Sequence, residues 1–130
     1  MILDTTVLVD AERGGDSLEE AIGDADDVAV AAITVAELRV GVELAKGRRR
    51  EKRERFVAAV FDAVPIEPYD LEVAEAHAVL LAHARRAGAS RNAHDLIVAA
   101  TARARDRQVV SSDQSGFAGL PGVSLSGDPG

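Results

Sequence analysis

Short apolar runs that alternate with longer amphipathic segments are the feature of this chain that most constrains its fold. Residues 28–33 read VAVAAI, a continuous apolar run of strand length. Such a run suits a strand that is buried on both faces, as strands are in parallel sheets covered by helices. Further strand candidates lie at residues 1–3, 108–111 and 122–125, with a very short edge strand at 65–68. The alternation predicts an α/β fold in which helices cover both faces of a short parallel sheet.

Helical periodicity marks most of the segments between these runs. Phe56, Val60 and Val64, for example, fall on one stripe of a helix. Glycines follow several of these segments, as is common just past the end of a helix. The predicted helices cover residues 5–12, 34–45, 48–64, 71–87 and 95–107, with a further short helix at residues 16–22.

With 130 residues, the chain has the size of one domain. We expect that domain to cover residues 1–125 and a flexible tail to follow at residues 126–130. The chain contains no cysteine, which excludes a disulfide scaffold and a thiolate-ligated zinc site. No apolar run approaches the ~20 residues of a membrane span, and the N-terminal segment lacks the basic region of a signal peptide. We therefore expect a soluble cytoplasmic protein.

The charge of the chain is unevenly distributed. Its net charge is −7, so on average the chain repels nucleic acid. Residues 46–55, KGRRREKRER, nevertheless carry seven basic and two acidic side chains. Such a run is most often a solvated helix surface, and otherwise it is a strip that binds phosphates or a partner. This strip and Arg39 are the candidates for contacts with the phosphates of a nucleic acid.

Four acidic residues follow predicted strands or stand near the beginning of helices. Asp4 follows the first strand, and Glu37 lies one turn into the helix after residues 28–33. Asp95 opens an alanine-rich helix, and Asp113 follows the last β-branched run. Functional sites of parallel sheets lie at the carboxyl ends of the strands, so we expect these carboxylates to converge. Grouped carboxylates raise each other's pKa unless a cation joins them, and oxygen-only ligands favour Mg²⁺ or Mn²⁺.

Each of these acids also has a purely structural interpretation. Asp4, Asp95 and Asp113 stand where helices begin, and aspartate is a good N-cap or first-turn residue. Glu37 completes the pattern Thr34-x-x-Glu37, which is that of a capping box. For any one of these acids, helix capping is as good an explanation as a metal site. The occurrence of all four together favours the metal site.

Four stretches of the chain together resemble a known family. In order they read MILDTTVLVD, TVAEL, HDLIVAATA and SSDQSGF. Their order and spacing are similar to those of the PIN-domain ribonucleases, specifically the VapC toxins of bacterial type II toxin–antitoxin systems. The resemblance implies a three-layer α/β/α fold and an endoribonuclease that uses Mg²⁺ or Mn²⁺ to hydrolyse RNA phosphodiester bonds. It also implies a toxin that inhibits translation, a cognate VapB-type antitoxin, a homodimer and a toxin–antitoxin hetero-oligomer.

The resemblance carries the family's acidic quartet onto this chain by position, as catalytic residues and metal ligands. The matching residues are Asp4, Glu37, Asp95 and Asp113. Asp4 and Asp95 are the expected direct ligands, because both leave rigid elements near the end of the sheet. Asp113 is expected to complete the ligand shell or hold a bound water, and Glu37 to orient the attacking water or hold a second metal.

The chain also departs from the family pattern after the strand candidate of residues 108–111. Ser112 stands where the family usually has threonine, so the hydroxyl is retained. Some members have a further acid at the positions that Ser115 and Gly116 occupy here, so that ligand is missing. Thr5, Arg39 and Ser112 are the candidates for substrate binding.

Two other functions stay open at this point. Asp4 after a strand also suggests an aspartyl-phosphate phosphatase, in which the carboxylate is the nucleophile. Thr6 occupies the place of the second aspartate of that signature, and a lysine after a late strand is missing. The other alternative is a non-catalytic PIN-like binding module that keeps the acids only as helix caps. His94 abuts Asp95, and we assign it no catalytic role.

Overall fold

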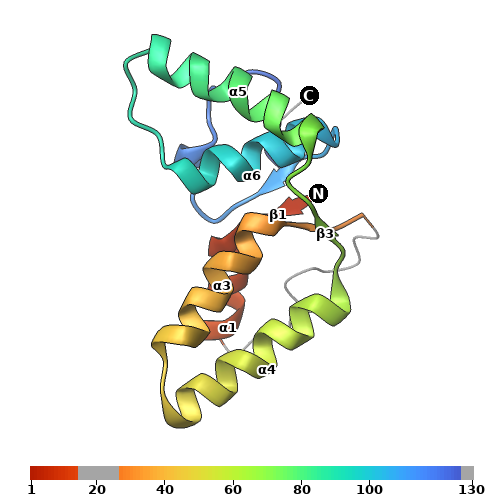
Figure 1. Ribbon diagram of the computed structural model, residues 1–130, viewed down its shortest axis with the longest axis vertical. Helices are drawn as coiled ribbons and strands as arrows, with labels where there is room; N and C mark the ends of the chain where they lie inside the picture. Colours follow the sequence, from red (N-terminus) through yellow and green to blue (C-terminus); the bar gives the residue numbers. More distant parts are fainter. Residues whose placement is uncertain (15–26, 127–130) are drawn as a thin grey trace.

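A small parallel sheet lies near the centre of the computed structural model, which describes residues 1–14 and 27–126 (Figure 1). The described strands are β1 (Ile2–Leu3), β2 (Val30–Ala31), β3 (Ile66–Glu67) and β4 (Val109–Val110). The helix predicted at residues 16–22 and residues 127–130 of the predicted tail lie outside the described part. Within the described ranges, no helix is long and apolar enough to cross a membrane.

The described strands all run parallel. β1 pairs with β4, and β2 pairs with β3. A parallel bridge between Ile2 and Ala29 joins the two pairs, which gives the order β3, β2, β1, β4. Leu125 bridges Val109 on the far side of β4, at the strand candidate of residues 122–125. Because β1 and β4 are neighbours, the residues that follow them emerge side by side at one edge of the sheet.

The helices follow the predicted periodicity closely. They are α1 (Thr5–Gly14), α3 (Ala32–Leu44), α4 (Gly47–Ala63), α5 (Leu71–Arg86) and α6 (Ala93–Ala104), and a 3₁₀ turn, η1 (Gln114–Gly116), follows β4. α5 begins where the sequence predicts, because the Asp70 carboxylate accepts a hydrogen bond of 3.0 Å from the Val73 amide. Gly88 lies just past its end with a φ of +66°, a conformation that glycine adopts readily.

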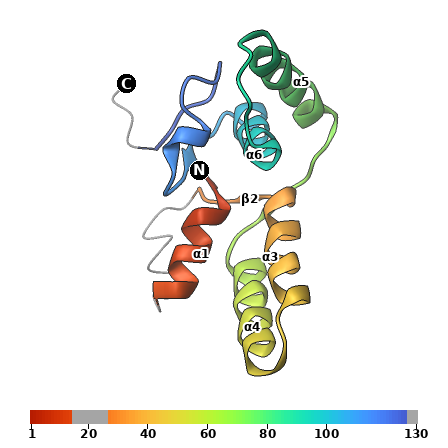
Figure 2. The same ribbon diagram turned by 90° about the vertical axis from the view of Figure 1, so that its left-hand side faces the viewer.

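The protein has three layers, because the sheet lies between two groups of helices and forms a separate hydrophobic core with each group. Along β1, Ile2 packs into a core with α5 and α6, whereas Leu3 packs into a core with α1, α3 and α4. The alanines of residues 28–31 face the first core and the valines face the second. Neighbouring strand residues point to opposite faces, so an unbroken apolar run serves a sheet covered on both sides. Figure 2 shows α5 and α6 on one side of β2, with α1, α3 and α4 on the other, which confirms the predicted fold class.

Helix α3 begins earlier than the sequence predicts. Residues 28–33 are expected to form one strand, but β2 ends at Ala31 and α3 begins at Ala32. Thr34 therefore lies inside α3 and is fully buried, and Ala31 takes the N-cap position without a side-chain hydrogen bond. The predicted capping box of Thr34 and Glu37 is wrong, because a capping threonine must precede the helix. The Glu37 carboxylate is consequently available for another role.

Helix α6 both begins and ends earlier than predicted. Asn92 is its N-cap, since its side chain accepts hydrogen bonds from the amides of His94 (2.9 Å) and Asp95 (3.2 Å). Asp95 is therefore a first-turn residue and not the cap. The helix ends at Ala104, and Asp106 then adopts a left-handed φ of 54°, which aspartate tolerates better than most residues.

Candidate active site

Asp4 is a buried carboxylate at the carboxyl end of β1. Its side chain is 4% exposed, and no cationic side chain in residues 1–14 and 27–126 pairs with it. Its Oδ2 accepts hydrogen bonds from the hydroxyls of Ser111 (2.8 Å) and Thr6 (3.0 Å). A carboxylate withdrawn from water needs such donors, because burial without partners costs several kcal/mol. The hydroxyls hold Asp4 in one orientation. Among the described residues, no backbone amide donates to its carboxylate, so its interpretation as a helix cap has no support there.

The pairing of β1 with β4 brings Asp113 close to Asp4. The Asp4 amide donates to the carbonyl of Val110 at 2.9 Å, which fixes the ends of the two strands together. Ser111 then links the acids, because its hydroxyl binds Asp4 and also accepts from the Asp113 amide at 3.1 Å. Asp113 does cap η1, since its Oδ1 accepts from the amide of Ser115 at 3.2 Å. The prediction that Asp113 caps a helix is therefore confirmed, and the same residue also lies close to Asp4.

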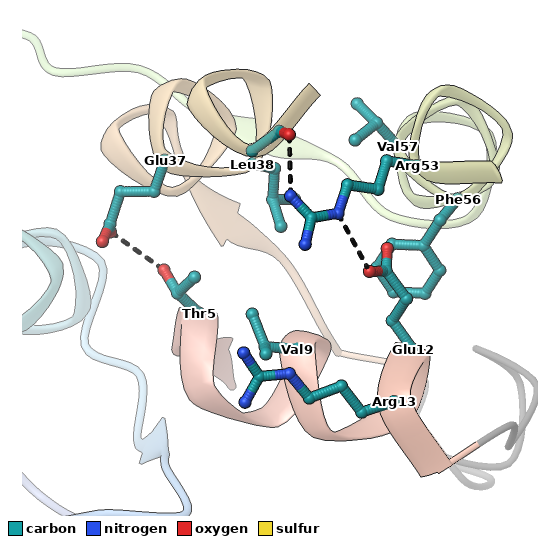
Figure 3. A pocket seen from close by; sticks show the side chains of 10 residues that line it. Thr5, Val9, Glu12, Arg13, Glu37, Leu38, Arg53, Phe56 and Val57 are labelled. Atoms are coloured by element: carbon teal, nitrogen blue, oxygen red, sulfur yellow. Dashed lines mark hydrogen bonds and ion pairs between the residues drawn. The ribbon is translucent and has the colours of Figure 1, made fainter. Parts of the chain in front are cut away.

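Glu37 extends from α3 toward Thr5, the neighbour of Asp4 in the chain (Figure 3). Its Oε1 accepts a hydrogen bond of 2.9 Å from the hydroxyl of Thr5, the first residue of α1. Its Oε2 lies 3.3 Å from Nδ1 of His94, at the start of α6. Both carboxylate oxygens are thus held by groups from other elements, and this is the arrangement of a positioned functional group.

Asp95 shows the electrostatic cost of assembling these acids. Burial raises its pKa above the ordinary value, and the nearby carboxylates of Asp4, Glu37 and Asp113 raise this pKa further. His94 acts in the opposite direction. Since like charges at short range disfavour ionisation, the raised pKa shows that the four predicted acids share one electrostatic environment.

One open hollow of about 390 Å³ brings three of the four acids together. Asp4, Glu37 and Asp95 line it, with Thr5 among the neighbouring side chains. Asp113 is not among its lining residues, although its charge acts on Asp95. We name this space the acidic hollow.

The donor set of the acidic hollow fits a hard divalent cation. Its lining includes the carboxylates of Asp4, Glu37 and Asp95 beside threonine hydroxyls, and oxygen ligands of this kind suit Mg²⁺ or Mn²⁺ better than softer metals. The buried Asp4 and the raised pKa of Asp95 both favour a nearby positive charge. Arg13 lines the acidic hollow but, within the described residues, forms no ion pair with either acid. As placed, no three acidic or histidine side chains of the described residues are close enough to hold one ion together.

The residues predicted to bind substrate have different places in the structure. Thr5 lines the acidic hollow and binds Glu37. Ser112 approaches the site through its backbone, whose amide donates to the Thr6 hydroxyl at 3.0 Å. Arg39 lies on α3 and pairs with Glu43 at 3.3 Å, outside the lining of the acidic hollow.

Sequence reasoning missed three polar residues of the site. Thr6 and Ser111 hold Asp4, and His94 contacts Glu37. The adjacent hydroxyls of Thr5 and Thr6, directly after Asp4, were a signal in the sequence for the first of these. Ser111 and His94 give no comparable local signal, because their partners lie far away along the chain.

Comparisons with known proteins agree with this architecture. The family model of the PIN domain matches residues 1–122. Ribonuclease VapC5 of Mycobacterium tuberculosis is 36% identical over 123 residues, which cover 94% of this chain and 88% of that protein. Toxin FitB of Neisseria gonorrhoeae is 36% identical over 97 residues, which cover 71% of this chain and 69% of that protein.

A solved structure of similar sequence shows the same fold. The crystal structure of VapBC-5 from Mycobacterium tuberculosis, a member of the VapBC family of toxin–antitoxin systems, contains a chain with 31% sequence identity. It superimposes with a TM-score of 0.77 over 95% of this chain and 94% of that chain. From the sequence matches, the shared fold and the gathered acids, the chain belongs to the PIN-domain family and is a VapC-type member of it.

Proposed function

We propose that this protein is the toxin of a type II toxin–antitoxin pair and an endoribonuclease that depends on Mg²⁺ or Mn²⁺. The observation that carries the proposal is the meeting of Asp4, Glu37 and Asp95, from three separate segments, around one open hollow. Carboxylates alone repel the phosphates of RNA, and a divalent cation removes that repulsion. The name ribonuclease of a relative that is 36% identical supports the same activity here.

Asp4 and Asp95 would hold the cation, with Asp113 completing the ligand set. When bound, the cation would neutralise charge on the phosphate and lower the pKa of a water molecule. The chain's own contribution is to keep the ligands in place. Ser111 and Thr6 bind only Oδ2 of Asp4, and no described group hydrogen-bonds its Oδ1. That oxygen therefore remains available as a ligand.

Glu37 would orient the water that attacks the phosphate. Thr5 holds one of its oxygens and His94 lies beside the other. A carboxylate fixed in this way can accept a proton from water at a defined position. Thr5 and His94 are then positioning residues that act through Glu37.

The phosphatase alternative receives no support from the site. Neither Lys46 nor Lys52 lines the acidic hollow, so no lysine faces Asp4 there. Thr6, which replaces the second aspartate of that signature, is engaged with Asp4 itself.

We further propose that the protein inhibits translation in the cytoplasm and is neutralised by a cognate VapB-type antitoxin. The solved relative is a member of the VapBC toxin–antitoxin family, which supports this partner. Large apolar side chains are exposed on α3 and α5: Val40 is 55%, Leu44 78% and Leu71 75% exposed. Surfaces of this kind support burial in a homodimer and in a toxin–antitoxin hetero-oligomer.

Cleavage of a labelled RNA by the purified protein tests the enzymatic proposal. We expect fragments with Mg²⁺ or Mn²⁺ and none with a chelator. Asp4→Asn and Asp95→Asn keep the side-chain volume, remove a ligand charge, and should abolish cleavage while circular dichroism shows an intact fold. Asp62→Asn, at an exposed acid of α4, is the matched control and should cleave normally. Cleavage by Asp4→Asn at the unaltered rate would refute the assignment, and a wild-type protein inert with both metals would favour the non-catalytic binding module.

A further inference from the structure

Three adjoining hollows form one continuous trough that leads away from the acidic hollow. The second hollow, of about 200 Å³, lies between α1, α3 and α4 and shares Thr5 and Glu37 with the acidic hollow (Figure 3). The third, of about 160 Å³, shares Glu12 and Arg53 with the second. Arg13, on α1, lines all three. We name the whole the α1–α4 trough.

The far end of the α1–α4 trough is basic. Four basic side chains and one acidic side chain line it: Arg13, Arg49, Lys52, Arg53 and Glu12. Arg53 is partly used within the protein, since it donates to the Gly41 carbonyl at 2.8 Å and lies 3.9 Å from Glu12. Within residues 1–14 and 27–126, Arg13, Arg49 and Lys52 make no ion pair or side-chain hydrogen bond. The unpaired positive charge of the far end is thus available to a ligand.

Arg50, also in the strip of residues 46–55, does not line the trough. Arg50 pairs with Glu43 and Glu54, so part of its charge is neutralised within the protein. Arg39, the other predicted phosphate contact, pairs with the same Glu43. Of the residues in the strip 46–55, Arg49, Lys52 and Arg53 line the trough, and Arg13 joins them from another helix.

We propose that the α1–α4 trough binds the RNA backbone on one side of the cleavage position, with Arg13, Arg49 and Lys52 contacting flanking phosphates. The inference rests on the proposed ribonuclease function. A chain of net charge −7 with an acidic cleavage site must attract a polyanion by local charge, and this trough supplies it next to that site. Figure 3 shows the Arg13 guanidinium extending back along α1 past Val9, toward the end where Thr5 and Glu37 lie.

The middle of the trough suits the remaining parts of a nucleotide. Val9, Leu38 and Phe56 line it with apolar surface. A nucleobase or ribose can pack on such a surface while the phosphates lie against the cations, as in other grooves that bind single strands. Because phosphate contacts carry no sequence information, the trough would set affinity and its salt dependence and leave the choice of cleavage sequence to other contacts.

Binding of a fluorescein-labelled single-stranded RNA, measured by anisotropy with a chelator present, tests the inference without requiring catalysis. Each lost phosphate contact should lower the slope of log K against log salt by about 0.7. Arg49→Gln/Lys52→Gln removes two contacts. When salt is raised from about 50 to about 200 mM, the factor by which RNA affinity falls should therefore be about sevenfold smaller for this variant than for the wild type. Arg13→Gln should show half that change in slope. Arg85→Gln/Arg86→Gln removes equal charge at the end of α5, remote from the trough, and should keep the wild-type slope.

Cleavage kinetics with Mn²⁺ separate the inference from the proposed function. We expect the Arg49/Lys52 double variant to raise KM and leave kcat unchanged. If the wild type cleaves and the double variant matches the Arg85/Arg86 control in affinity, slope and KM, the trough assignment is wrong and the ribonuclease proposal stands. If the wild type binds through the trough but never cleaves, the RNA-binding inference stands and the proposed activity fails. If the double variant loses only binding of the purified antitoxin, the trough is a protein site and the inference is overturned.

Discussion

Replacing Gly116 by alanine should disturb Asp95 specifically. An added Cβ would lie 2.4 Å from Oδ2 of Asp95 and 3.2 Å from its Cγ, so the carboxylate must rotate away. Moving a side chain off its preferred rotamer costs about 0.5–1.5 kcal/mol. The φ of Gly116 is not in the left-handed region, so alanine itself fits the backbone and returns about 0.4–1 kcal/mol through the unfolded chain. The net change in the free energy of unfolding should therefore stay within about 1 kcal/mol.

A double-mutant cycle isolates this contact from other effects. In an Asp95→Ala background the obstructing oxygen is gone, so Gly116→Ala should stabilise the protein by about 0.4–1 kcal/mol. The coupling energy, obtained from urea unfolding of the four proteins without metal, should be about 0.5–1.5 kcal/mol. An equal effect of Gly116→Ala in both backgrounds would refute the reasoning.

The same substitution should also weaken metal binding at the proposed site. The Asp95 carboxylate occupies the space next to Gly116. Because we propose Asp95 as a metal ligand, displacing its carboxylate should weaken binding, and calorimetric titration with Mn²⁺ should show a weaker affinity for Gly116→Ala than for the wild type. Unchanged Mn²⁺ affinity would show that Asp95 is not a ligand in the orientation described.

Three further predictions concern the supports of the site. Asn92→Ala removes the acceptor of two amide hydrogen bonds and should cost about 0.5–2 kcal/mol in urea unfolding; an unchanged midpoint would contradict the cap. Phe117 follows η1 and is 1% exposed, so Phe117→Ala should lower the free energy of unfolding by about 3–5 kcal/mol in urea unfolding. A much smaller loss would mean that the loop collapses into the cavity. Because the folded pKa of Asp95 is raised above 3.8, the metal-free wild type should lose stability relative to Asp95→Asn as pH rises from 3.8 through that pKa. If the free energies of unfolding of the two proteins changed in parallel with pH, the raised pKa of Asp95 would be contradicted.

The accuracy with which the sequence predicts the ends of a helix differs from one helix to another. Helix α5 could be predicted almost to the residue, because Asp70 caps it and Gly88 follows it. The start of α3 could not, since the apolar run of residues 28–33 fits a strand or a buried helix start equally well. Because of that ambiguity, the prediction of a capping box formed by Thr34 and Glu37 was wrong. Sheet pairing decides such a case: Val30 and Ala31 pair with β3, and the helix begins directly after them at Ala32.

By itself, the sequence determined the alternation of short strands and helices, the burial of the sheet on both faces, and the placing of acids after the strands. These features follow from periodicities of a few residues. The tertiary structure alone decided that Ser111 holds Asp4 from 107 positions away, that the backbone of Gly116 lies against Asp95, and that Arg13 joins the basic residues of α4. Such contacts depend on which strands pair and how helices cross, and no local pattern of side chains encodes the distance between segments so far apart in the chain.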